Sequence, residues 1–205
     1  MKRFLSKNIF TGLLFAMLWA SASVAAKFGL RSVEPLVLFN IRFLFAGGIL
    51  LVYTHLLQKN RLPAGKEWKQ VTIFGTFNTA LYLGIFILSL QFLTAGVTTL
   101  AIALNPLFIS ILSAAWTKRK VTPLEWLSIA LGIVGVGAAS YPLLQDSQVT
   151  VTGLLLLALS MGTYSFGSVY YAAINWTLSR TAVNAWQVLI GGVLIIPLTL
   201  MLHTQ

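Results

Sequence analysis

The 205-residue chain contains no cysteine and only four acidic residues. Without cysteine it has no disulfide framework, no thiol nucleophile and no cysteine metal site. Its two histidines, His55 and His203, are far apart in the sequence, and neither has a partner at the spacing of metal ligands. The sequence also lacks the paired carboxylates or the nucleophile and base that an intramembrane enzyme needs. We therefore expect no metal, no cofactor and no enzymatic activity.

Apolar residues are abundant instead. Hydrophobic residues make up 58% of the chain and charged residues 9%. The apolar residues form seven stretches of about 18 to 22 residues, which is the length of a helix that crosses a bilayer. A segment that spans the bilayer must be helical, because its backbone groups can bond only to one another there. The sequence predicts an all-α polytopic membrane protein with a lipid bilayer as its surroundings. The expected spans are residues 9–26, 36–57, 71–92, 97–116, 124–141, 152–173 and 182–202.

The first 26 residues also fit the pattern of a secretory signal peptide. Lys2 and Arg3 precede an apolar run that ends near the small residues Ala20, Ser21 and Ala22. This run is about 18 residues long, whereas the apolar region of a signal peptide has roughly 7 to 15. We favour a first spanning helix over a cleaved signal.

The formal net charge is +10. In a soluble protein this excess would suggest nucleic acid, but here the cations cluster in alternate loops, so we expect no nucleic-acid partner. Cations favour the cytoplasmic loops of membrane proteins. This predicts a cytoplasmic N-terminus, because the loops on one side hold only Lys27 and Arg31. Those on the other side hold Lys2, Arg3, Lys7, Lys59, Arg61, Lys66, Lys69, Lys118, Arg119, Lys120 and Arg180.

Two short glycine motifs recur in the same order. The motif at residues 12–14, Gly-Leu-Leu, returns 141 residues later at 153–155, and the pair Gly47-Gly48 returns 144 residues later as Gly191-Gly192. Five predicted crossings separate the two copies. Because five is odd, the second copy would be inverted in the membrane, as in many secondary transporters. The expected units are a first five-helix repeat at residues 1–143 and an incomplete second repeat at 150–205.

Several motifs occur in the order of a known family. They are residues 12–19 in the first span, Pro35 followed by residues 42–46 in the second, and 105–107 in the fourth; Glu125 then precedes the glycine-rich stretch 132–137, and Gly153 restarts the pattern. With these motifs the chain resembles the EamA-type transporters of the drug/metabolite transporter superfamily. The resemblance implies ten helices in two inverted five-helix repeats. On that basis we expect a helix bundle with the first repeat and two helices of the second, truncated after helix seven.

Arg42 is the strongest candidate for substrate contact. It lies about six residues, or roughly 9 Å, from the outer end of the second span. One interpretation is a group on the translocation path that binds a carboxylate. The other is an arginine that extends to the outer headgroups or pairs with Glu34. No aspartate or glutamate occupies the middle of a span, so a membrane-embedded proton carrier is not visible.

Other polar and aromatic residues lie deep in the predicted spans. Pro106 follows Asn105 near the middle of the fourth span and predicts a kink there, either exposing backbone groups to substrate or only shaping the packing. Asn78 and Tyr82 share one helix face at four-residue spacing, although such side chains more often join helices than bind substrate. The candidate lining residues are Trp19, Arg42, Asn78, Tyr82, Asn105, Tyr164 and Gln187.

The family resemblance implies a carrier of small metabolites in the inner or plasma membrane. We expect it to work by alternating access between the inverted halves, on amino-acid-like or drug-like compounds and in the direction of export. Its partners would be a small-molecule substrate and lipid, and homo-oligomerisation stays open. The alternative is a non-transporting membrane partner, or an inactive fragment of a ten-helix transporter.

Overall fold

The structure is a computed structural model that describes residues 2–29, 31–144 and 149–203. All regular structure in these residues is helical, and they contain no strand, which confirms the predicted all-α class. Within the helices, the side chains at 2–8, 19–20, 22–23, 27, 140, 143–144 and 202–203 lie outside the description.

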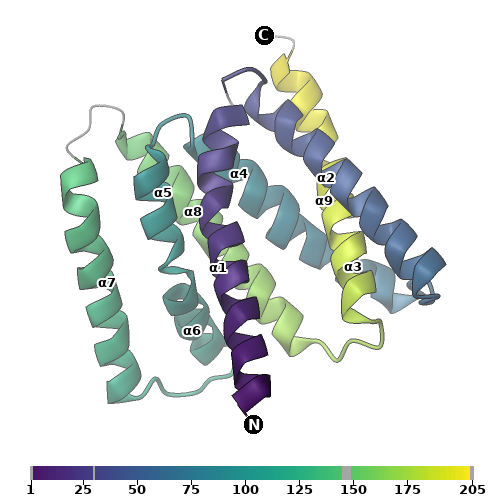
Figure 1. Cartoon of the computed structure of the whole chain (residues 1–205), viewed down its shortest axis with the longest axis horizontal. Coiled ribbons are helices and arrows are strands. Elements are labelled where there is room, and N and C mark those ends of the chain that lie inside the picture. The colour runs from purple at the N-terminus through teal and green to yellow at the C-terminus, as the bar shows by residue number, and fades with distance from the viewer. Residues whose placement is uncertain (1, 30, 145–148, 204–205) are drawn as a thin grey trace.

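Each predicted span coincides with one helix or with consecutive helical segments (Figure 1). The first is α1 (Lys2–Gly29), the fifth α7 (Pro123–Leu144), the sixth α8 (Val151–Ala173) and the seventh α9 (Arg180–His203). The second consists of α2 (Pro35–Leu51) and the π-helical segment η1 (Val52–Leu57). The third consists of α3 (Lys66–Gly75), the π-helical η2 (Thr76–Leu81) and α4 (Tyr82–Ser89), and the fourth of α5 (Ala95–Ile102) and α6 (Asn105–Trp116).

Five of these helical runs, counted over the described residues, are long and apolar enough to cross a membrane. They are Pro35–Leu57, Lys66–Ser89, Ala95–Trp116, Val151–Ala173 and Arg180–Met201. In α1 and α7 the described apolar stretches are shorter, Ile9–Leu18 and Pro123–Ala139. A multi-pass membrane protein is therefore supported, and the first and fifth crossings stay predictions.

Hydroxyl side chains cap the starts of α5, α8 and α9. The Oγ1 atom of Thr94 accepts from the backbone N–H of Val97 at the start of α5, and Thr150 does the same for Gly153 at the start of α8. At the start of α9, the Oγ atom of Ser179 accepts from the N–H of Ala182. Each cap satisfies an N–H group that has no partner within its helix.

The predicted kink in the fourth span is confirmed. α5 ends at Ile102 and α6 begins at Asn105, with a turn between them. The N–H groups of Ala103 and Leu104 bond to carbonyls three residues earlier, at 3.1 and 2.9 Å. Pro106 has no N–H with which to continue the α-helical ladder and stands in the first turn of α6, where that loss costs least.

α9 packs between α2 and the third span. Glycines make this close approach possible: a Cβ on Gly75 of α3 would stand 2.8 Å from the carbonyl oxygen of Gln187. Likewise, a Cβ on Gly192 would stand 3.0 Å from the Cβ of Phe43 in α2. Small residues at such crossings let helix backbones come close in a membrane. This packing places Gln187 of α9 beside the third span.

α8 packs against η2 and α4 of the third span and against α6 of the fourth. α1 and α7 both pack on α5, and Figure 1 shows α7 at one edge of the bundle, on the opposite side from α2 and α9. The larger buried cluster joins α2, α4, α8 and α9 through residues such as Phe43, Ile87, Leu157 and Ile195. The centre of the bundle is therefore built around the third span.

Candidate substrate cavity

A cavity of about 360 Å³ opens among the helices. Sites for small molecules have volumes of roughly 300–1,000 Å³. Side chains of α1, α2, η2, α4, α5, α8 and α9 contribute to its wall. The lining residues are Phe15, Leu18, Phe39, Arg42, Phe43, Asn78, Thr79, Tyr82, Leu83, Phe86, Ile102, Tyr164, Gln187 and Val188.

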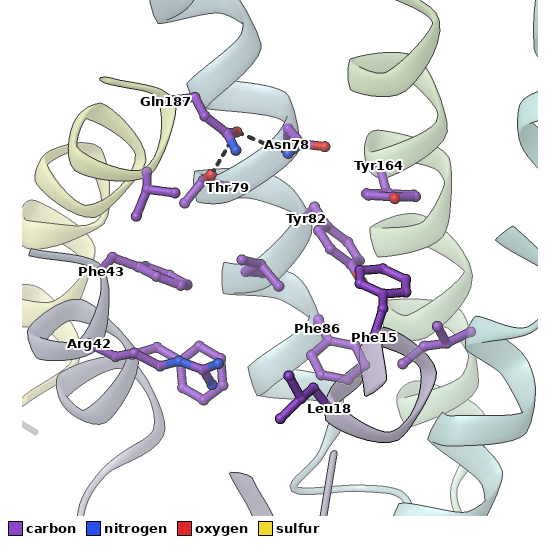
Figure 2. Close-up of a pocket in the computed structure, with 14 residues that line it drawn as sticks. Phe15, Leu18, Arg42, Phe43, Asn78, Thr79, Tyr82, Phe86, Tyr164 and Gln187 are labelled. Carbon is purple, nitrogen blue, oxygen red and sulfur yellow. Dashed lines mark hydrogen bonds between the residues drawn. The ribbon is translucent and has the colours of Figure 1, made fainter. Parts of the chain in front are cut away.

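The structure brings together most of the residues that the sequence suggested for the site. Arg42, Asn78, Tyr82, Tyr164 and Gln187 come from four different spans and all line this one cavity. Figure 2 shows Gln187 and Asn78 near one end, Arg42 towards the other, and aromatic rings between them. The cavity therefore has two polar ends and an apolar middle.

An amide group at the first end is tightly hydrogen-bonded. The Oε1 atom of Gln187 accepts from the Nδ2 atom of Asn78 at 2.9 Å and from the Oγ1 atom of Thr79 at 3.1 Å (Figure 2). The Nε2 atom of Gln187 donates to the Oδ1 atom of Asn184 at 3.4 Å. These four residues, called the amide cluster below, connect α9 to η2. The Oδ1 atom of Asn78 forms no hydrogen bond to a described residue.

Aromatic rings form the middle of the cavity. Tyr82 of α4 and Tyr164 of α8 have ring centroids 4.7 Å apart, and Phe86 follows Tyr82 at 6.1 Å. Across the cavity, Phe39 and Phe43 of α2 make an edge-to-face contact at 5.6 Å. This wall suits an apolar molecular body, because flat rings offer large contact areas at little cost in conformational freedom.

Of the cavity-lining residues that the structure describes, Arg42 alone carries a formal charge. Its guanidinium carbon lies 5.5 Å from the ring centroid of Phe39, a cation–π arrangement. Arg42 forms no hydrogen bond or ion pair with any described residue. The N–H groups of the guanidinium are therefore available to a bound anion.

Asn105 and Trp19 are not placed on the cavity wall. Asn105 is buried, with 4% of its surface exposed, and it does not line the cavity. Its side-chain oxygen and nitrogen have no hydrogen-bond partner among the described residues. Trp19 falls within α1, but its side chain lies outside the described part of the chain. A substrate role for either residue stays a prediction.

The π-helical segments coincide with polar groups. η2 contains Asn78 and Thr79, and η1 contains Thr54 and His55. The wider turn of a π-helix changes the direction of successive side chains, and such turns occur often at functional sites. In η2 this allows the adjacent residues Asn78 and Thr79 both to reach Gln187.

A second polar cluster joins the start of α3 and the loop before it to the loop before α9. The Glu67 carboxylate accepts from both Nη atoms of Arg61, at 2.7 and 2.6 Å, from the N–H of Ala64 at 2.8 Å, and from the hydroxyl of Thr177. The hydrogen bond to Glu67 raises the pKa of the Arg61 guanidinium above its ordinary value. We call Arg61, Glu67 and Thr177 the loop network.

Further bonds attach η1 to the start of α9. The hydroxyl of Thr54 donates to that of Thr181 at 3.1 Å, and Asn60 donates to Thr54 at 3.0 Å. The indole N–H of Trp186 donates to the Nε2 atom of His55 at 3.0 Å. Together with the loop network, these contacts hold the end of the bundle from which α3 and α9 start, next to the amide cluster.

Most of the aromatic wall was missed from the sequence. Phe86 could have been found, because Asn78, Tyr82 and Phe86 repeat every four residues along one helix face. Phe39 and Phe43 show the same spacing in α2.

Among the described residues, no group of three or more His, Cys, Asp or Glu side chains could hold a metal ion.

In the part of the chain that the structure describes, membrane-length apolar helices surround a cavity of a size suited to a small molecule. The EamA-like transporter family matches residues 6–141, more than half of the chain. The protein therefore belongs to this family.

The chain is also similar to individual curated transporters. It is 28% identical over 191 residues to the "Uncharacterized inner membrane transporter YedA" of Escherichia coli, covering 90% of this chain and 60% of that one. It is 26% identical to "Uncharacterized transporter YvbV" of Bacillus subtilis, over 91% of this chain and 61% of the relative. The chain thus spans about 60% of the length of these relatives. No solved structure gives a significant match.

Proposed function

We propose that the protein carries small metabolites, amino-acid-like or drug-like compounds, across the inner membrane by alternating access, in the direction of export. The substrate would bind in the cavity between Arg42 and the amide cluster. The single observation that carries this proposal is the convergence of Arg42, Asn78, Tyr82, Tyr164 and Gln187, from four spans, on one cavity of about 360 Å³. Convergent polar groups in an apolar pocket are typical of a ligand site.

The packing of α2 on α9 supports the inverted-repeat part of the proposal. These helices carry the recurring glycine pairs, Gly47-Gly48 and Gly191-Gly192, and they pack extensively on each other. Gly192 lies against Phe43, and Gly191 lies against Thr79. Two symmetry-related helices that touch each other must lie beside the symmetry axis. We therefore place a pseudo-two-fold axis in the membrane plane near this crossing, between a first unit at 1–143 and a second at 150–205.

The position of Arg42 favours a role in substrate binding over the interpretation in which its side chain only reaches the lipid headgroups. Its guanidinium lies on the cavity wall against Phe39. Glu34, the acid proposed as its alternative partner, is eight residues away, about 12 Å along the helix axis. It lines a separate hollow of about 240 Å³ with Gln91 and Thr199. In the proposed orientation the N-terminus is cytoplasmic, and Arg42 faces the outer half of the membrane.

Flux through native membranes tests this function. Vesicles from cells that produce the full chain would be loaded with a labelled panel of amino acids, organic acids and organic cations. We expect efflux of at least one solute above that of vesicles without the protein, and a loss of that efflux in Arg42→Gln and Asn78→Ala. Arg31→Gln is the matched control, because Arg31 also stacks on a phenylalanine, Phe28, at 4.8 Å but outside the cavity.

Abundant, folded protein without flux of any panel member would contradict the proposal. That result would favour the alternative of a non-transporting membrane partner or an inactive fragment of a ten-helix transporter. Flux that persists unchanged in Arg42→Gln and Asn78→Ala would keep the transporter but remove the cavity as its substrate site.

A further inference from the structure

We propose that the cavity selects a net-anionic substrate: a small carboxylic acid with an apolar body and no positive charge. The inference rests on the proposed function, since it names the substrate class of the same cavity. It narrows the amino-acid-like and drug-like compounds proposed above to those that carry a carboxylate but no ammonium group. The carboxylate would bind Arg42, the body would lie along the aromatic wall, and a neutral donor on the far side would meet Asn78.

The first step is the charge of the lining. Among the described residues that line it, Arg42 is the only formally charged side chain, and none is acidic. The described acids are engaged or placed elsewhere: Glu67 pairs with Arg61, Glu125 pairs with Arg119 at 2.8 Å, and Glu34 lines the separate hollow. The described lining therefore carries a net positive charge and contains no counter-ion for it.

The Arg42 guanidinium can bind an anion. It has no hydrogen bond or ion pair to a described residue, so its N–H groups can bind a carboxylate in bidentate fashion. Contact with the Phe39 ring keeps the group at the wall while leaving its edge available. Arg42 is an exposed residue, so an anion that enters the cavity can reach its guanidinium.

The third step is the cost of an ammonium group in the same cavity. An ammonium has three N–H donors. In the amide cluster, the Oε1 atom of Gln187 already accepts two hydrogen bonds, which leaves the Oδ1 atom of Asn78 as the free amide acceptor on the wall. The hydroxyl oxygens of Tyr82 and Tyr164 can also accept, but they too are neutral. Neutral acceptors suit a hydroxyl or amide donor, whereas none of them supplies the negative charge that would offset the burial of an ammonium group.

Aromatic faces also attract cations, which would favour the opposite charge class. Here Phe39 already faces the Arg42 guanidinium. A second cation in a cavity of about 360 Å³ would lie close to Arg42, and like charges repel most strongly in a low-dielectric site. The aromatic wall therefore acts as the surface for an apolar body.

Three probes with nearly the same body separate the charge classes: 3-phenylpropionate is an anion, L-phenylalanine a zwitterion and 2-phenylethylamine a cation. Binding would be measured calorimetrically on the full chain in lipid nanodiscs. We expect 3-phenylpropionate to bind at least about tenfold more tightly than L-phenylalanine, because both carry the carboxylate but only L-phenylalanine must also place an ammonium group in the cavity. The amine should bind most weakly, because it has the ammonium group and no carboxylate. Arg42→Gln should remove most of the preference for the anion over the other two probes, while Arg31→Gln should leave this preference unchanged.

A preference for L-phenylalanine or the amine would overturn the proposal, and so would the absence of binding by all three probes. Arg42→Lys keeps the charge without the guanidinium fork, so it covers the case in which Arg42→Gln fails to fold. The wild-type ranking needs no variant. Metabolite flux in the vesicle assay together with the wrong charge preference would remove only the substrate class. No flux and no binding would remove the proposed function as well.

Discussion

Gly47 of α2 lies directly against the main chain of Leu189 in α9. A Cβ atom on Gly47 would stand 2.9 Å from both the Cα and the N atom of Leu189. The two helices therefore touch backbone to backbone at this point. The contact fixes the position of α9, and with it the distance between Gln187 and the third span.

We expect Gly47→Ala to destabilise the protein by about 1–3 kcal/mol, because backbone cannot move aside as a flexible side chain can. Gly48→Ala is the matched control: a Cβ there has nothing within 4 Å, and alanine favours a helix over glycine. Thermal unfolding in detergent would compare the two variants. Equal melting temperatures would show that the α2–α9 contact is looser than described.

Thr79→Val should weaken the amide cluster. It removes the hydroxyl that donates to the Oε1 atom of Gln187 but keeps the shape of a side chain that is 1% exposed. Polar bonds between membrane helices contribute about 0.6 kcal/mol on average and up to about 1.7. Thr76→Val in the same π-helical segment serves as the control, because its hydroxyl only donates back to the carbonyl of Thr72.

The readout for this pair is the free energy of unfolding, together with the affinity for the best cavity ligand. We expect Thr79→Val to lower both and Thr76→Val to change neither. An equal loss in the two variants would contradict a specific role for the amide cluster.

Glu67→Gln should release the loop before α9. Glu67 and Glu125 both accept from an arginine six residues earlier and from an N–H three residues earlier. Each carboxylate also accepts from a threonine hydroxyl. For Glu67 this is Thr177, 110 residues away, whereas for Glu125 it is Thr122, three residues away. Glu67→Gln therefore weakens a tie between two loops, whereas Glu125→Gln affects one helix start.

Limited trypsin digestion of the protein in nanodiscs would detect this difference. Cleavage after Arg180, the first residue of α9, should become faster in Glu67→Gln and stay unchanged in Glu125→Gln. Equal cleavage rates in all three proteins would show that the loop network does not hold this loop.

Features that depend on neighbouring residues were predictable from the sequence. The length of each apolar stretch locates the helices, and Pro106 alone locates the break in the fourth span. Four-residue spacing places Asn78 and Tyr82 on one face, and both line the cavity. Such signals are local, because a helix forms from its own chain segment.

Features that depend on packing between distant segments were not predictable. Asn78 and Gln187 are 109 residues apart, and Glu67 and Thr177 are 110 apart. The type of a residue also does not show whether it lines the cavity or lies on the outer surface of the bundle. Phe39 is buried at the cavity, whereas Phe45 of the same helix is 71% exposed. Both are apolar residues in an apolar span, and only the positions of the neighbouring helices distinguish them.

The central claim is that the cavity is reached alternately from the two sides of the membrane. The chain has no cysteine, so Leu83→Cys places a single thiol on the cavity wall. Leu131→Cys on α7, where Leu131 is 63% exposed and does not line the cavity, is the lipid-facing control.

The measurement is the labelling of each thiol with a membrane-impermeant maleimide in right-side-out and in inside-out vesicles. Our account predicts that the thiol at position 83 reacts from both faces while the one at 131 reacts from neither. Reaction at position 83 from one face only, or from neither, would contradict alternating access through this cavity.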